Sequence, residues 1–177
     1  MVRAPARLDW ATQNHLKNHY IRQADPARLA GLVAGILNSR NVALNDDYKA
    51  RLESTIPLVR DGTKTLLELS DATIFALKTR PLEMPEKALV LLSDETRLRL
   101  GRLRDAYAAT ADWEVPALEA LNREFAEKEG VGLGKIGPPL RAVLSGGSPA
   151  PDLAGALVSL GKHESLGRLD DALSLNG

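Results

Sequence analysis

Residues 138–169 read PPLRAVLSGGSPAPDLAGALVSLGKHESLGRL, and this string predicts three short helices separated by two turns. The first helix is predicted by apolar residues that recur at the spacing of one helical face: Ile136, Leu140, Val143 and Leu144. Residues 145–151 must end that helix, because their two glycines supply left-handed backbone and their two prolines cannot extend the hydrogen-bond ladder.

The two helices that follow have equally clear signals. Asp152 is placed to cap the second one, whose apolar face comprises Leu153, Ala156, Leu157 and Leu160. Gly161 ends this helix, and Leu166 with Leu169 begins a third face after residues 162–164. The end of the chain is therefore predicted to be a compact helical unit.

Composition extends the helical prediction to the whole chain. The 177 residues are 44% hydrophobic but only 4% aromatic, and a chain rich in leucine and alanine favours helix packing over layered β-sheets. We expect an all-α protein. Residues 79–86 hold two prolines and no apolar period, which predicts two consecutive small helical subdomains over residues 1–82 and 83–177.

Charge and cysteine content exclude several classes of protein. Lys plus Arg equals Asp plus Glu at 23 each, so a surface that binds nucleic acid must come from the arrangement of charges. The lack of cysteine excludes disulfides and thiolate metal sites and is consistent with the cytoplasm. No apolar run approaches the roughly 18 residues of a membrane span, and we expect a soluble protein without a targeting segment.

Two motif-like strings do not predict chemistry. Residues 132–137 spell GxGxxG, but a dinucleotide site needs a strand before it, and here a helical pattern precedes it and prolines follow. His15 and His19 share a helical face, yet HLKNH lacks the glutamate of a metalloprotease motif. We therefore expect no catalytic residue, no metal site and no cofactor in this segment.

Arginines invite a nucleic-acid interpretation at two places. Between residues 94 and 107, Leu98, Leu100, Leu103 and Tyr107 alternate with Arg97, Arg99, Arg102 and Arg104. The plainer interpretation is a solvated helix face paired with Asp94, Glu95 and Asp105, and it is favoured over phosphate binding.

Arg141 differs, because it precedes the glycine- and proline-rich turn. Its planar guanidinium can bond or stack on an unpaired RNA base, and Pro149, Pro151 and Leu153 offer apolar surfaces for such bases. On the residues alone, the simpler alternative is an arginine that covers a helix end.

Three blocks of the chain resemble bacterial glutamyl-tRNA synthetases, of the class I family. Residues 138–169 contain, in the family's order, Pro-Leu-Arg, Leu-Ser-Gly, a proline before a helix, Leu-Gly-Lys-x-Glu and Arg-Leu. Residues 6–30, ARLDWATQNHLKNHYIRQADPARLA, resemble the junction into the anticodon-binding half, and residues 113–131 resemble the helix before Pro-Leu-Arg. The resemblance implies the C-terminal anticodon-binding region, of helical-cage type.

The resemblance also implies which residues bind tRNA. The family's anticodon contacts fall on Arg141, Pro151 and Leu153, and Ala150 stands where relatives can have threonine. A second set is implied near residues 60–66, where discriminating members place a base-reading arginine. Gly62 aligns there, so either Arg60 or Lys64 substitutes or the position does not discriminate.

We therefore expect a monomeric, cytoplasmic tRNA-binding module of a glutamate–tRNA ligase, for glutamate tRNA and, by the Gly62 argument, glutamine tRNA. The active-site motifs His-x-Gly-His and Lys-Met-Ser-Lys-Ser are absent from the sequence, so a catalytic domain that uses ATP and Mg²⁺ would lie upstream in the parent enzyme. The alternative is a helical protein-interaction module without RNA binding.

Overall fold

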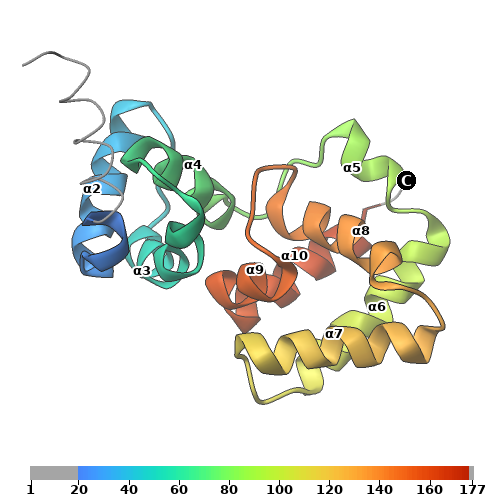
Figure 1. The fold of residues 1–177 in the computed structure, drawn as a ribbon. Helices are drawn as coiled ribbons and strands as arrows, with labels where there is room; N and C mark the ends of the chain where they lie inside the picture. The colour runs from blue at the N-terminus through green and yellow to red at the C-terminus, as the bar shows by residue number, and fades with distance from the viewer. Residues whose placement is uncertain (1–19, 176–177) are drawn as a thin grey trace, which may run out of the picture.

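The structure, a computed structural model, describes residues 20–175, and every regular element in that range is a helix (Figure 1). The first group comprises α2 (Pro26–Ser39), α3 (Tyr48–Val59), the 3-10 turn η1 (Arg60–Gly62) and α4 (Leu66–Leu77). The second group comprises α5 (Glu86–Val90), α6 (Asp94–Ala109), α7 (Val115–Glu129), α8 (Leu133–Ser145), α9 (Leu153–Leu160) and α10 (Lys162–Leu173). The all-α prediction is confirmed.

Local sequence signals set most helix ends. Pro26 occupies the first turn of α2, where its missing N–H has no partner to lose. The Thr65 and Ser93 side chains accept the N–H groups of the residues three further on and so cap α4 and α6. Gly130 ends α7 in the left-handed conformation, at φ 67°.

The ends of α3 are an uncapped start and a last turn that contains a proline. The helix is preceded by Asp47, whose side chain makes no cap bond. Pro57 does not end the helix, which continues to Val59. Because proline has no N–H, Pro57 removes one bond of the helical ladder, in the last turn of α3.

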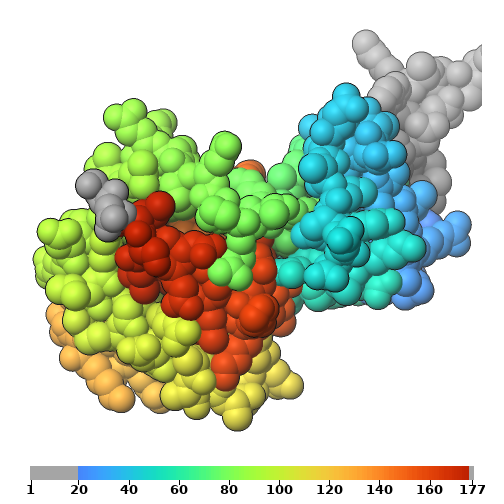
Figure 2. Space-filling view, turned by 180° about the vertical axis from the view of Figure 1, so that it is seen from behind, coloured from blue at the N-terminus to red at the C-terminus, as the bar shows by residue number. Residues whose placement is uncertain are grey.

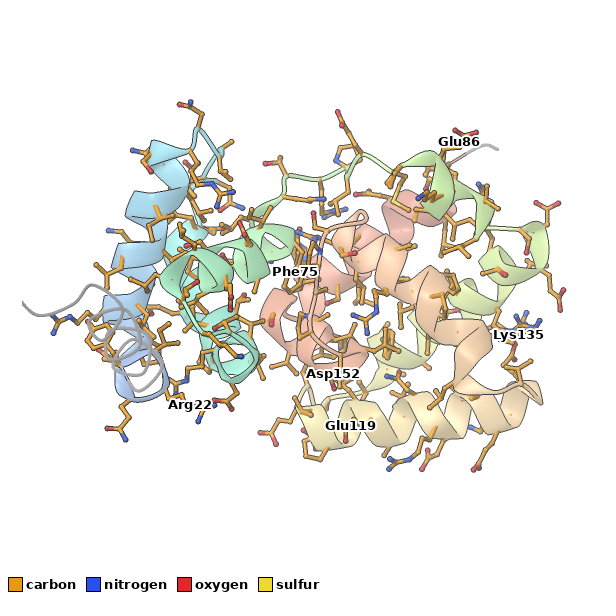
Figure 3. The ribbon with its side chains drawn as sticks, turned by 45° about the horizontal axis from the view of Figure 1, so that its top comes forward. Arg22, Phe75, Glu86, Glu119, Lys135 and Asp152 are labelled. Atoms are coloured by element: carbon orange, nitrogen blue, oxygen red, sulfur yellow. The ribbon has the colours of Figure 1, made fainter. Side chains whose placement is uncertain are left out.

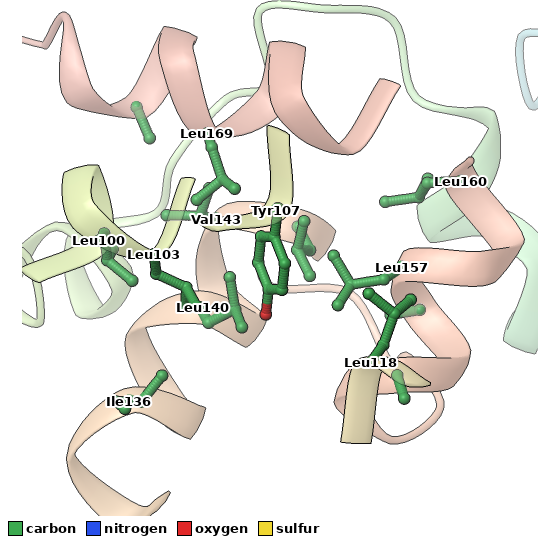
Figure 4. Close-up of a cluster of buried hydrophobic side chains, with 14 of the residues drawn as sticks. Leu100, Leu103, Tyr107, Leu118, Ile136, Leu140, Val143, Leu157, Leu160 and Leu169 are labelled. Carbon is green, nitrogen blue, oxygen red and sulfur yellow. The ribbon is translucent and has the colours of Figure 1, made fainter. Parts of the chain in front are cut away.

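Buried apolar side chains form two clusters. The first core lies among α2, α3 and α4 and includes Leu29, Val33, Leu52, Ile56 and Leu69. The second core lies among α6 to α10 and includes Leu100, Leu103, Tyr107, Leu140 and Leu157 (Figure 4). In the space-filling view the first core's helices form a lobe beside the larger second part (Figure 2).

The end of α4 crosses between these two clusters. Phe75 and Ala76 belong to the second core, whereas Leu77, in the same turn, packs in the first core. Figure 3 places Phe75 at the border of the two parts. The division at residue 82 stays a prediction, and α4 contributes to both cores.

A set of hydrogen bonds, here called the polar joint, ties the two parts together. Arg51 Nη1 donates to the carbonyl of Leu160 at 3.0 Å, and Ser54 Oγ donates to the carbonyl of Ser159 at 2.9 Å. Both acceptors lie in the last turn of α9, where helix carbonyls lack partners of their own. These bonds dock α3 against the end of α9.

Arg168 is the centre of the polar joint. Its Nη1 donates to the carbonyls of Phe75 (2.8 Å) and Leu144 (2.6 Å), and its Nη2 to that of Lys78 (3.1 Å). Its Nε bonds Glu164 at 3.0 Å. A guanidinium fits this place because the C-terminal ends of α4 and α8 both present unpaired carbonyls and the negative end of the helix dipole.

Candidate nucleic-acid interface

The turn between α8 and α9 has the conformation that its sequence predicts. Gly146 and Gly147 have φ values of 61° and 88°, in the left-handed region. A Cβ atom on Gly147 would lie 2.9 Å from Cγ of Pro85, so a side chain has no room there. Asp152 then caps α9 by accepting the N–H of Gly155 at 3.3 Å. We call residues 146–152 the binding turn.

Arg141 is exposed on α8 and holds the far side of the binding turn. Its Nη1 donates to the carbonyl of Ala150 at 3.1 Å and to that of Pro151 at 2.7 Å. Within residues 20–175, no protein group accepts a hydrogen bond from Nε or Nη2 of Arg141. The guanidinium therefore ties α8 to the turn through Nη1, and its other nitrogens have no partner among the described residues.

Three hollows border the binding turn. One, of about 480 Å³, lies between Gly147, Ser148 and the segment of α5, and the other two lie beside residues 149–154. Of those two, the first hollow, of about 330 Å³, lies between the turn and η1 and is lined by Leu58, Val59, Gly62, Thr63, Ala72, Pro149, Ala150, Pro151 and Asp152. The second hollow, of about 260 Å³, lies between the turn and α7 and is lined by Glu119, Asn122, Arg123, Leu133, Arg141, Asp152, Leu153 and Ala154. Figure 3 shows Glu119 and Asp152 on the same side of the molecule.

The structure brings most of the implied tRNA-binding residues to these two hollows. Gly62 meets Ala150 and Pro151 in the first, although nearly half of the chain separates them. Arg141 and Leu153 meet in the second. The prolines and Leu153 give flat apolar walls, and the guanidinium supplies hydrogen-bond donors, which together suit an unstacked base.

Arg60 and Lys64 do not line either hollow. Arg60 Nη1 donates to the carbonyl of Ala24 at 3.1 Å, so its guanidinium is held against the first part. Lys64 is exposed, and its backbone N–H bonds the Glu68 carboxylate at 2.7 Å as part of the α4 cap. Of the three residues considered at η1, only Gly62 faces the first hollow.

The four arginines of α6 are engaged within the protein. Arg97 donates to the carbonyls of Leu92 and Leu175. Arg99 pairs with Glu95 (3.1 Å) and Glu129 (3.5 Å), Arg102 Nε bonds Glu129 (3.0 Å), and Arg104 Nε bonds Asp170 (2.8 Å). The hydrogen bond from Arg102 holds the pKa of the Glu129 carboxyl below its ordinary value. The paired arrangement favours the plainer interpretation of this row.

Two residues of α6 do not follow the grouping of leucines against arginines. Arg99 is 8% exposed and therefore buried, and Leu98 is 66% exposed. Leu98 lies roughly half a turn from Leu100 and cannot share its face. Asp94 has no ion pair among the described residues, whereas Glu129 and Asp170, distant in sequence, supply partners.

Asn122 is a lining residue that the sequence reasoning missed. It lies on α7 between Leu118 and Phe125 at helical spacing, so a polar residue occupies the buried stripe. Its Oδ1 lies 2.5 Å from the Tyr107 hydroxyl. An asparagine among apolar residues at this spacing was the available signal.

The two motif-like strings have no site around them in the described residues. The 132–137 segment opens α8 directly after α7, with helix and not strand before it. His15 and His19 lie outside the described residues. Within residues 20–175, no three His, Asp or Glu side chains converge in a metal-binding arrangement, and no helix has the length and apolarity needed to span a bilayer.

Known proteins match this chain over nearly its whole length. The family model described as "Anticodon binding domain" matches residues 11–173. The glutamate–tRNA ligase of Phenylobacterium zucineum is 66% identical over 174 residues, which are 98% of this chain and 37% of that protein. The Caulobacter vibrioides glutamate–tRNA ligase is 49% identical over 174 residues, with the same coverage.

A solved structure has the same fold. The glutamate tRNA ligase from Elizabethkingia meningosepticum, in complex with its amino acid, superposes with a TM-score of 0.70 at 22% identity, covering 90% of this chain and 31% of that one. This chain spans little more than a third of the curated relatives it matches. It belongs to the anticodon binding domain family, in the form that glutamate–tRNA ligases contain.

Proposed function

We propose that this chain binds the anticodon loop of tRNA and thereby positions that tRNA for glutamylation by a catalytic domain outside the chain. The observation that carries the proposal is the convergence of Gly62 with Ala150 and Pro151 on one hollow, beside Arg141 and Leu153 on the next. Splayed bases need such a series of small recesses, since each unstacked base buries its own face.

The chemistry of the binding turn supports this assignment. Proline rings and Leu153 provide stacking surfaces, and Arg141 adds a planar donor that can bond a base edge or stack on it. The polar joint supports the assignment as well, because Arg168 and Lys78 bond the carbonyls that end α8, directly before the binding turn. The start of the turn is thereby fixed relative to the end of α4.

The parent enzyme would be an ATP- and Mg²⁺-dependent glutamate–tRNA ligase, and this segment would contribute tRNA binding without catalysis or a cofactor of its own. Glycine at position 62 offers no side chain to the first hollow, so we propose that the module accepts glutamine tRNA as well as glutamate tRNA. We further propose that it works as a monomer in the cytoplasm.

The test is binding of the 177-residue chain to glutamate tRNA, glutamine tRNA and a glutamate tRNA with an altered anticodon, at two salt concentrations. The proposal expects binding that falls when the anticodon is altered and similar affinity for the two natural tRNAs. An affinity that is the same for every anticodon but falls steeply with salt would indicate contacts to phosphates alone. That result would contradict the proposed function.

One observation favours the alternative, a protein-interaction module. The end of the short helix α5 and the residue after it expose three consecutive apolar side chains, Leu89 (42%), Val90 (76%) and Leu91 (39%). Exposed apolar patches are typical of protein contacts. This alternative would be favoured if Val90→Ser abolished binding of a protein to the chain and if RNA binding did not depend on the anticodon.

A further inference from the structure

We propose that Asn122 is an additional base-reading residue, whose side-chain amide donates a hydrogen bond to a carbonyl oxygen of an anticodon base held in the second hollow. The inference rests on the proposed function and adds a residue to it. Asn122 is 5% exposed, lines the second hollow together with Arg141 and Leu153, and comes from α7 on the opposite wall.

Tyr107 fixes the orientation of the Asn122 amide. The Tyr107 hydroxyl lies 2.5 Å from Asn122 Oδ1, and burial raises the pKa of that hydroxyl well above its ordinary value, so it stays a donor. With Oδ1 accepting from Tyr107, the amide nitrogen is the end left for another partner.

The Tyr107 ring is itself held in place. Its ring meets the edge of Trp113, with the centroids 5.7 Å apart and the planes at 75°, and the Trp113 indole N–H donates to the carbonyl of Leu157 at 2.9 Å. Figure 4 shows the hydroxyl end of Tyr107 beside Leu140, surrounded by core side chains. An amide positioned in this way presents its donor with little loss of entropy on binding.

The amide nitrogen of Asn122 keeps access to the hollow. Among the described residues, no protein acceptor bonds it. The enclosed side-chain atoms that lack a hydrogen bond are Asn45 Oδ1 and Arg99 Nε, and the amide nitrogen of Asn122 is not among them. A hydrogen-bond donor in a recess that excludes most solvent discriminates strongly between ligands. A ligand that places no acceptor opposite the donor leaves the donor without a hydrogen bond, which costs affinity. Where this donor meets the 4- or 6-position of a base it disfavours adenine, because adenine places an amino group there and uracil or guanine places a carbonyl oxygen.

The charges around the second hollow fit a neutral base better than a phosphate. Glu119 and Arg123 line it from α7, and Arg141 and Asp152 line it from the other wall, so two cations are matched by two carboxylates. A phosphate would meet the carboxylates as well as the guanidinium groups. Hydrogen bonding to a base edge avoids this repulsion.

The test measures dissociation constants for glutamate tRNA transcripts in which each anticodon position carries each of the four bases in turn. We expect the wild-type chain to disfavour adenine at one position by roughly tenfold or more relative to a carbonyl-bearing base there. Asn122→Leu, which is close in volume but has no amide, should reduce that preference to about twofold or less and leave the other positions unchanged. Tyr107→Phe should weaken the same preference, because it frees the amide to rotate.

Ser70→Ala is the matched control, since it removes a buried hydroxyl that bonds only the Leu66 carbonyl of its own helix. A uniform loss of affinity for every transcript in Asn122→Leu would assign Asn122 to the core alone and overturn the inference. If Asn122→Leu does not fold, a wild-type chain that tolerates adenine at every position overturns it equally. A wild-type chain without any anticodon preference would instead overturn the proposed function, and the inference with it.

Discussion

Arg141 is the residue whose substitution tests the proposed tRNA contact most simply. Its Nη1 bonds the carbonyls of Ala150 and Pro151, and its Nε and Nη2 have no acceptor among the described residues. Arg141→Ala should therefore weaken binding of glutamate tRNA by about 1–3 kcal/mol, the scale of one good base contact. Filter binding or fluorescence anisotropy would measure this.

Lys49→Ala is the control for the Arg141 measurement, because Lys49 is an exposed cation on α3, away from the binding turn. Equal losses of tRNA affinity in Arg141→Ala and Lys49→Ala would mean that tRNA binding depends only on the overall positive charge of the chain. An unchanged dissociation constant in a folded Arg141→Ala variant would remove Arg141 from the interface.

Gly62 is the position where added chemistry should change tRNA preference. A Cβ atom built there meets nothing within 4 Å, so a side chain can enter the first hollow without strain. Gly62→Arg should fold normally and raise the ratio of the dissociation constants for glutamine and glutamate tRNA, by up to about tenfold for one bidentate base contact. A ratio that does not move, with Gly62→Ala as control, would show that η1 lies outside the anticodon contact.

Residue-scale prediction from sequence works best where backbone chemistry is local. The glycines and prolines of residues 146–151 specify their own turn, and Asp152 specifies its own cap. Arg60 shows the limit, since its guanidinium bonds the carbonyl of Ala24, 36 residues away, and nothing in the local sequence indicates that partner. Asn122 was missed because its meaning depends on Tyr107 from another helix.

At the scale of elements, Arg168 joins the ends of α4 and α8. Its side chain is 0% exposed and bonds three carbonyls and one carboxylate. Arg168→Met should destabilise the fold by about 3–5 kcal/mol, because it leaves Glu164 and the carbonyls without their donor. Urea unfolding would measure this.

Arg104→Ala supplies the matched comparison. Arg104 is also bonded to a carboxylate, that of Asp170, but the pair is exposed to solvent. Its loss should cost less than about 1 kcal/mol. Similar costs for the two variants would contradict the central role assigned to Arg168.

The Glu129 carboxylate joins α7 to α6 and makes stability depend on pH. The bond from Arg102 lowers its pKa from the ordinary 4.5. The ionised carboxylate therefore stabilises the folded state at pH values above its ordinary pKa. This stabilisation is lost as the pH falls through the lowered pKa of the folded state. The melting temperatures of the wild type and Glu129→Gln should differ at pH 7 and converge in acid. A difference in melting temperature that does not change with pH would contradict the stabilising role assigned to the Glu129 carboxylate.

The helices of this chain could be predicted from their periodicity, but their faces could be predicted only in part. α8 buries the four residues expected of it. α6 does not bury all the leucines or expose all the arginines, because their alternation does not follow the helical period. Arg99 is buried, and it pairs there with Glu129 of another helix. Long-range ion pairs of this kind leave no local trace.

For the whole molecule, the two cores predict how the chain can be divided. Phe75 and Ala76 lie before the predicted boundary at residue 82 but pack in the second core. A fragment of residues 83–177 lacks them and also lacks two carbonyl partners of Arg168. A fragment of residues 74–177 should be more stable by about 3 kcal/mol or more, the cost of losing a buried phenylalanine.

Denaturant midpoints of the two fragments measure that difference. Equal midpoints would support a clean boundary at residue 82 and contradict the contribution of α4 to the second core. Proline content could suggest the linker, but the sequence could not place Phe75, because a helix between two cores has the same period whichever core a residue joins.

The most direct test of the central claim is to map where an anticodon base lies on the protein. Glutamate tRNA with a photoreactive thiouridine in the anticodon would be cross-linked to the 177-residue chain, and the modified peptide identified by mass spectrometry. We predict attachment within residues 141–153, at η1 or at residues 119–123 of α7, and loss of cross-linking with excess unmodified tRNA. Attachment confined to α2 or to the arginines of α6 would contradict the central claim.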